Sequence, residues 1–192
     1  MIVDRIAAVV ESQIITLSEV DQMVNLRVIL RESDESDQSY RRRILDDLVA
    51  QSLRLSDAER FGATDVSKDS IEARLVEIIE RFPSQSEFDQ ALQRSEMTLD
   101  ELRVVLKRQL QVDKYIEERF SPQIFVSIEE IDAFFRGPWS EQREARGLPL
   151  PPLAAVTEEI RSLLKAERLR QEVSKWTAQL RARANVDIYV FR

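Results

Sequence analysis

The stretch PPLAAVTEEIRSLLKAERLRQEVSKWTAQLRARANVDIYVFR, residues 151–192, decides the fold. After two prolines, apolar residues recur at steps of three and four as far as Ala184, which is typical of one face of a helix. From Asn185 onward the period changes to two, which is typical of a strand. At 1.5 Å per residue the helix would be about 50 Å long. Its apolar stripe comprises Leu153, Val156, Ile160, Leu163, Ala166, Leu169, Val173, Trp176, Leu180 and Ala184.

Neither of these two elements is stable alone. So long a helix needs other elements to cover its apolar side, and a strand at the chain's end needs a partner strand. The candidate partner is at the other end of the chain, where IVDRIAAVVESQII (residues 2–15) reads as strand. Glu11-Ser12-Gln13 would turn this strand back on itself as a hairpin. The capping box Thr16-Leu17-Ser18-Glu19 then predicts a helix that runs to about Leu30.

Helical patterns fill most of the remaining chain. They begin at Tyr40 or at capping residues and end at Gly62, at Phe82-Pro83 or at Ser121-Pro122. Residues 137–152, GPWSEQREARGLPLPP, hold two of the three glycines and four of the six prolines, and they predict a loop or linker. The predicted helices are those of residues 40–61, 67–82, 84–92, 98–120 and 127–135.

The composition excludes several classes of protein. The chain has 192 residues, 43% of them apolar, and a net charge of −7, which argues against a general nucleic-acid binder. No apolar run approaches the length of a membrane span, so no stable membrane insertion is expected. No signal-peptide pattern is present, so an exported protein would have lost its signal from these residues. The absence of cysteine fits an oxidising compartment or the cytosol equally.

The side-chain chemistry is equally restricted. With no histidine and no cysteine, the chain has no Ser-His-Asp or Cys-His system and no Cys/His zinc site. It also has no glycine-rich phosphate loop. Neighbouring acidic residues such as Glu129-Glu130 and Glu158-Glu159 fall in first helical turns, where the helix dipole accounts for them. We therefore expect no catalytic residue, no metal and no cofactor.

A set of large apolar residues lies on short or peripheral predicted elements, or flanks the predicted linker. One interpretation is ordinary core, because most large apolar residues are buried. The other is a cleft for extended apolar segments of another chain, a surface to which methionine and aromatic side chains are suited. The candidate residues for binding a client polypeptide are Met23, Leu26, Phe82, Phe88, Met97, Phe134, Phe135 and Trp139.

The order of these elements resembles a known family. VDRIAAVVESQIITLSEVD (residues 3–21) closely resembles the opening of the mature N-terminal domain of SurA-type periplasmic chaperones and related parvulin-type foldases. Glu11-Ser12-Gln13 stands where the family has an Asn-Gly turn. RILDDLV (residues 43–49) and MTLDEL (residues 97–102) are similar to later helical segments of the family, and Trp176 with Val-Asp-Ile (residues 186–188) resembles its C-terminal helix and strand.

The resemblance implies a fold that the residue patterns alone do not reach. This fold is mainly α-helical, a SurA N-terminal/trigger-factor-C-terminal-like peptide-binding domain, with a small β element that pairs the N- and C-terminal strands. Residues 1–192 would form a single chaperone core. It would comprise a helical part (1–136), a linker (137–152) and the long helix with its strand (153–192). In the family, parvulin isomerase domains occupy the place of this linker, and about sixteen residues are too few for a domain.

The resemblance also implies a function. We expect an ATP-independent periplasmic chaperone, not an enzyme, that binds unfolded outer-membrane or secreted polypeptides. Two alternatives remain open from the sequence. One is a structural module that uses the same fold to form a homodimer, and the other is a peptidyl-prolyl isomerase with a site unlike that of the parvulins.

Overall fold

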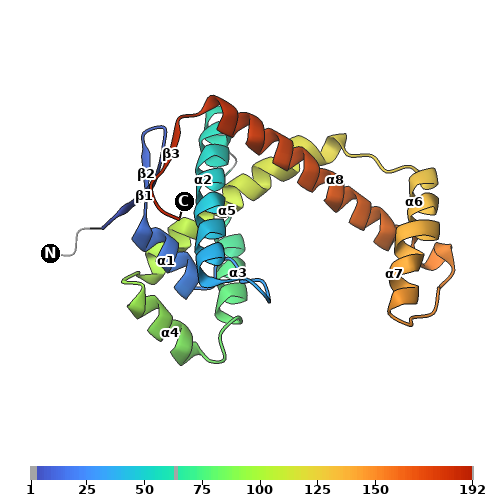
Figure 1. Ribbon diagram of the computed structural model, residues 1–192, viewed down its shortest axis with the longest axis horizontal. Coiled ribbons are helices and arrows are strands. Elements are labelled where there is room, and N and C mark those ends of the chain that lie inside the picture. Colours follow the sequence, from blue (N-terminus) through green and yellow to red (C-terminus); the bar gives the residue numbers. More distant parts are fainter. Residues whose placement is uncertain (1–3, 63–64, 192) are drawn as a thin grey trace. The chain divides into compact units, whose positions relative to one another are not determined.

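The computed structural model describes residues 4–62 and 65–191 (Figure 1). It is mainly helical and contains one small antiparallel sheet, as the sequence predicted. The elements in chain order are β1 (Ile6–Val10), β2 (Gln13–Thr16), α1 (Leu17–Asn25), α2 (Asp37–Arg60), α3 (Lys68–Ile79), α4 (Gln85–Arg94), α5 (Leu99–Phe120), the 3-10 turn η1 (Ser121–Gln123), α6 (Ile128–Phe134), the π turn η2 (Phe135–Trp139), α7 (Ser140–Ala145), α8 (Leu153–Arg183) and β3 (Val186–Ile188).

The sheet joins the two ends of the chain in the order β2-β1-β3. β1 and β2 form the predicted hairpin, whose turn places Glu11 at a left-handed φ of 53°. β3 pairs antiparallel with the other edge of β1, and Figure 1 shows it (red) beside the hairpin (blue). The expected pairing of the terminal strands is therefore confirmed. Ile2 and Val3, which the predicted strand included, lie outside the described residues.

The chain divides into two compact units. Unit 1 comprises Met1–Tyr115 and Thr177–Arg192, and unit 2 comprises Ile116–Trp176. Helices α5 and α8 each contribute residues to both units.

Unit 1 has two clusters of buried apolar residues. The first packs β1, β2 and α1 against the inner face of α2. The second packs Leu26 among α3, α4 and α5, where Phe82 and Phe88 meet edge to face with ring centroids 5.6 Å apart. The fully buried members of the two clusters include Ala7, Ala8, Val20, Ile44, Leu45 and Val49 in the first, and Leu26, Phe88, Ala91, Leu102 and Leu106 in the second.

Unit 2 has a smaller core of its own. Ser127 begins α6 with a capping box, in which its hydroxyl accepts from the N–H of Glu130 and the Glu130 carboxylate accepts from the N–H of Ser127. The ring of Phe135 stacks on that of Trp139 at 5.3 Å, and the guanidinium of Arg143 lies 4.8 Å from the Trp139 ring. The buried residues are Val126, Ile131, Trp139, Val156 and Ile160.

Three sequence predictions need correction. Helix α1 ends at Asn25 instead of Leu30, because the chain turns at Arg27, which has a φ of 51°. The predicted linker is helical as far as Ala145, because the buried Trp139 packs this segment into the core of unit 2. The apolar stripe of α8 is not covered throughout, since Leu163 is 48% exposed.

Candidate functional site

Unit 1 contains a groove with a cavity volume of about 580 Å³ beside the edge strand β2. We call it the β2 groove. Its walls come from β2, α1, α2, the segment before α5, and α5 itself. The lining residues are Gln13, Ile14, Ile15, Glu19, Gln22, Met23, Leu48, Gln51, Ser52, Leu55, Glu59, Glu96, Met97, Glu101, Val105, Arg108 and Gln109.

The apolar part of the lining includes side chains that solvent still reaches. Ile14 is 56% exposed, although it is a large β-branched residue in a strand. Met97 and Val105 are half-buried, whereas Ile15 and Met23 belong to the core below. An apolar side chain of another molecule would therefore bury surface on entering the β2 groove, which is the main source of affinity for such ligands.

The β2 groove borders the edge of a strand. Three consecutive residues of β2, Gln13, Ile14 and Ile15, line it. Consecutive side chains of a strand point to opposite faces of the sheet, so a cavity that contacts all three lies along the strand's edge.

Backbone pairing shows which polar groups that edge presents. The N–H of Tyr189 donates to the carbonyl of Ala7 at 2.9 Å, and the N–H of Glu11 donates to that of Asn185 at 2.8 Å. The odd-numbered residues of β1 thus direct their backbone groups toward β3. Ile14 lies opposite one of them, Val9. In an antiparallel pair the backbone groups of such opposed residues point away from each other, so the N–H and C=O of Ile14 face the free edge.

The charge in the lining is mainly negative. Four glutamates contribute carboxylates and Arg108 contributes one guanidinium. Two of the glutamates are placed by helix capping: Glu19 accepts from the N–H of Thr16 at 2.7 Å, and Glu101 from the N–H of Thr98 at 2.7 Å. The backbone hydrogen bond from Thr98 lowers the pKa of Glu101 below its ordinary value.

The structure places most of the sequence-predicted client-binding residues in the cores. Five of the eight are buried: four are core side chains that a client would reach only if the core opened, and Met23 is part of the floor of the β2 groove. The physical reason is the packing of short helices: each uses its few large apolar residues to hold itself to its unit. The five are Met23, Leu26, Phe82, Phe88 and Trp139, all 9% exposed or less.

The other three predicted residues are half-buried and belong to different units. Met97 lines the β2 groove of unit 1, where Met23 also contributes to the floor. Phe134 and Phe135 pack on the core of unit 2. Sequence reasoning missed Ile14, Val105 and Glu96. The signal for Ile14 was an apolar residue directly after a hairpin turn, in a strand that the sheet order leaves at an edge.

Across residues 4–62 and 65–191, the histidine, cysteine and carboxylate side chains form no group of three suited to a metal ion. In the same part of the chain, no helix combines the length and the apolar character that crossing a bilayer requires.

Comparisons with known proteins connect this architecture to one group. The chain is 29% identical over 139 residues to a SurA chaperone of Saccharophagus degradans, a match that covers 69% of this chain and 32% of the relative. It is 23% identical over 185 residues to a SurA chaperone of Alkalilimnicola ehrlichii, with coverages of 92% and 41%. The chain thus spans well under half the length of these curated relatives. No family model matches it.

A solved structure extends the likeness to nearly the whole fold. It comes from work on PEB4 and Cj1289, two SurA-like chaperones of Campylobacter jejuni, and matches with a TM-score of 0.55 and 12% identity. The match covers 97% of this chain and 99% of the other. Sequence similarity along most of the chain, together with this shared fold, supports a SurA-like protein.

Proposed function

We propose that this chain is a periplasmic chaperone that holds unfolded outer-membrane or secreted polypeptides without ATP, and that the β2 groove of unit 1 is its client-binding site. The observation that carries the proposal is the groove itself: about 580 Å³ lined by the exposed Ile14 and the half-buried Met97 and Val105. The names of the SurA and SurA-like relatives support a chaperone and a periplasmic location.

The size of the groove sets the strength of binding. It accommodates a few apolar side chains of a client, and an unfolded client loses conformational entropy when it becomes ordered. We expect dissociation constants in the micromolar range, about −8 kcal/mol. Binding of this strength needs no energy source for release.

We also propose that the chain acts without a parvulin domain and that both units together form the chaperone core. Within residues 137–152, where the family resemblance would place an isomerase domain, the chain completes η2 and forms α7. Isomerisation of a proline-containing test peptide by the purified chain at the rate in buffer alone would support this proposal.

Suppression of aggregation tests the binding site. A denatured outer-membrane β-barrel protein is diluted into buffer with increasing amounts of the purified chain, and light scattering is followed. The double variant Ile14→Thr/Met97→Gln removes apolar surface from the β2 groove without changing charge. We expect it to require about three- to tenfold more protein for equal suppression, because roughly 1 kcal/mol of apolar contact is lost.

The matched control removes similar surface elsewhere in unit 1. Val76 on α3 and Val104 on α5 are each 51% exposed and do not line the groove. Val76→Thr/Val104→Thr should suppress aggregation as well as the unchanged chain does. Equal loss in both variants would place client binding outside the β2 groove. No suppression by the unchanged chain, together with a stable dimer in sedimentation, would favour the alternative of a dimerisation module.

A further inference from the structure

We propose that the β2 groove selects extended segments whose apolar residues are flanked by lysine or arginine, and that such a segment binds as an additional strand beside β2. This inference rests on the proposed function and names the class of client that the site accepts.

The first support is the free edge of β2. β2 pairs only with β1 in the three-stranded sheet, and the N–H and C=O of Ile14 face outward beside the groove. An extended peptide supplies one acceptor and one donor to such a position, and its alternate side chains then enter the adjoining pocket. Ile14 is apolar and 56% exposed at this edge, so an added strand would pair its backbone groups and cover apolar surface that now faces solvent.

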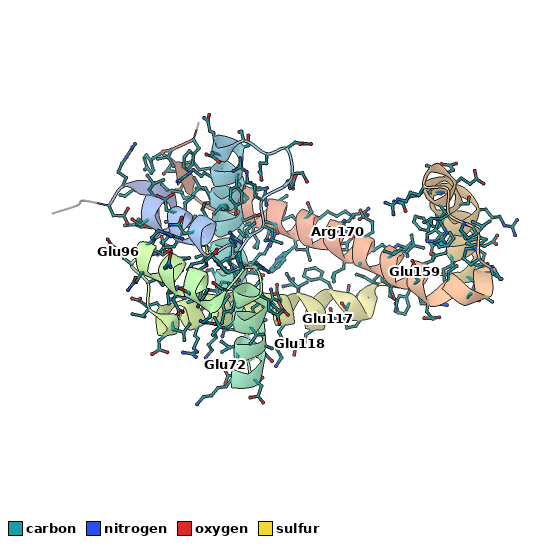
Figure 2. The ribbon with its side chains drawn as sticks, turned by 90° about the horizontal axis from the view of Figure 1, so that it is seen from below. Glu72, Glu96, Glu117, Glu118, Glu159 and Arg170 are labelled. Carbon is teal, nitrogen blue, oxygen red and sulfur yellow. The ribbon has the colours of Figure 1, made fainter. Side chains whose placement is uncertain are left out.

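The second support is the distribution of charge around that edge. In the described part of the chain, Glu59 and Glu96 are exposed and no ion pair involves them. Figure 2 labels Glu96, which lies between the green helices α4 and α5. Glu19 and Glu101 use Oε2 for helix capping, which leaves Oε1 of each available to a cationic ligand. One guanidinium, that of Arg108, lines the groove against these four carboxylates.

The same charge argues against a second copy of the chain as the occupant. The chain carries a net charge of −7, so two copies repel each other, and an acidic groove is a poor match for another acidic molecule. A segment with cationic flanks gains attraction from the carboxylates, while its apolar centre gains burial. This complementarity favours a client polypeptide of local positive charge.

Synthetic peptides test the charge selection. Three fluorescently labelled peptides share one alternating apolar centre and carry two lysines, two glutamines or two glutamates on the flanks. We expect fluorescence anisotropy to show the lysine peptide binding about tenfold more tightly than the glutamine peptide at low salt, and the glutamate peptide binding most weakly. The differences should shrink as salt is added.

A pair of double variants locates the effect. Glu59→Gln/Glu96→Gln should bring the affinity for the lysine peptide close to that for the glutamine peptide, and leave the latter unchanged. Glu117→Gln/Glu159→Gln makes the same charge change at two exposed glutamates that Figure 2 labels and that do not line the groove. This control should keep the preference. Equal effects of both variants would overturn the assignment to the groove.

Backbone methylation tests the added strand. Two further versions of the lysine peptide carry N-methyl groups on alternate residues. In one version the methylated amides lie on the edge of the extended peptide that faces β2, and in the other they lie on the opposite edge. Only the peptide methylated on the edge facing β2 should lose binding, about tenfold or more, whereas equal binding of both would overturn the strand addition. Binding of all three flanked peptides with the same affinity would refute the charge selection and leave the proposed function standing. Binding of none, with no suppression of aggregation, would remove the proposed function itself.

Discussion

Glu35 and Arg43 form the ion pair that ties the loop before α2 to that helix. The carboxylate accepts from Nε of Arg43 at 2.9 Å and from Nη2 at 2.6 Å, an arrangement in which one guanidinium holds both oxygens. The hydrogen bond from Arg43 lowers the pKa of Glu35 below its ordinary value. A carboxyl with a depressed pKa in the folded state stabilises the fold above its unfolded pKa and loses that contribution as the pH falls through its folded pKa.

Replacement of Glu35 should therefore have an effect that depends on pH. We expect Glu35→Gln to lower the Tm at pH 7. We expect the difference from the unchanged chain to shrink as the pH falls below the ordinary glutamate pKa of about 4.3, and to vanish once the pH is below the lowered pKa of the folded state. Circular dichroism melts between pH 7 and pH 3 measure this. Glu32→Gln, in the same loop, makes the same charge change while keeping the Glu35–Arg43 pair. An equal and equally pH-dependent loss in Glu32→Gln would show that general charge, not the pair, is responsible.

At the scale of single residues, the sequence did not show which of the predicted client-binding side chains are buried in the folded chain. Phe88 is 1% exposed and Met97 is half-buried, yet both lie on or beside a short helix and both have mostly polar neighbours in the sequence. Which of the two faces the core depends on how α4 and α5 pack, and one amino-acid sequence does not show that packing geometry. The exposed Ile14 escaped notice because its exposure follows from the order of strands in the sheet.

Helix α6 shows how one residue supports an element. It is only seven residues long, so its intrinsic helical stability is small and its cap matters more than in a longer helix. We expect Ser127→Ala to destabilise unit 2 by about 1 kcal/mol, because the N–H of Glu130 then loses its acceptor. The urea midpoint of tryptophan fluorescence measures the change. Ser127→Thr keeps the hydroxyl and should leave the midpoint nearly unchanged. Equal shifts in both variants would mean that side-chain packing, not capping, is disturbed.

At the scale of elements, capping residues made the sequence informative. The hydroxyl groups of Thr16, Thr98 and Ser127 each accept a hydrogen bond from the backbone N–H three residues later, as their patterns predicted. These signals are local, so they survive in any tertiary context. Residues 137–145 are helical where a loop was predicted, because the prediction gave more weight to their glycine and proline than to Trp139, whereas residues 146–152 are non-helical as predicted. Gly137 takes a non-helical conformation, which lets helical turns continue past Pro138.

At the scale of the whole molecule, the family resemblance implied that the N- and C-terminal strands pair, and the antiparallel pairing of β1 with β3 confirms this. The residue patterns had indicated only that each end contained a strand in need of a partner. Hydrogen bonds between residues about 180 positions apart leave no periodic trace in a sequence. For the same reason the patterns did not show where one compact unit ends and the next begins.

The two units should unfold at different urea concentrations. Both tryptophans of the chain, Trp139 and Trp176, belong to unit 2, so their fluorescence reports mainly on that unit, whereas circular dichroism follows all helices. Unit 2 has one cluster of buried residues and unit 1 has two, so unit 2 buries less apolar surface. We expect the fluorescence midpoint to fall at lower urea than the midpoint of circular dichroism.

Two core truncations separate this outcome from a single cooperative transition. Ile160 in unit 2 and Leu45 in unit 1 are both fully buried, and each change to alanine should cost about 2–5 kcal/mol. Ile160→Ala should lower the fluorescence midpoint, whereas Leu45→Ala should lower the later part of the circular dichroism transition and leave fluorescence nearly unchanged. If both variants shift both signals together, the units unfold as one. If unit 2 instead unfolds first, as we expect, the β2 groove should stay intact, because all of its lining residues belong to unit 1.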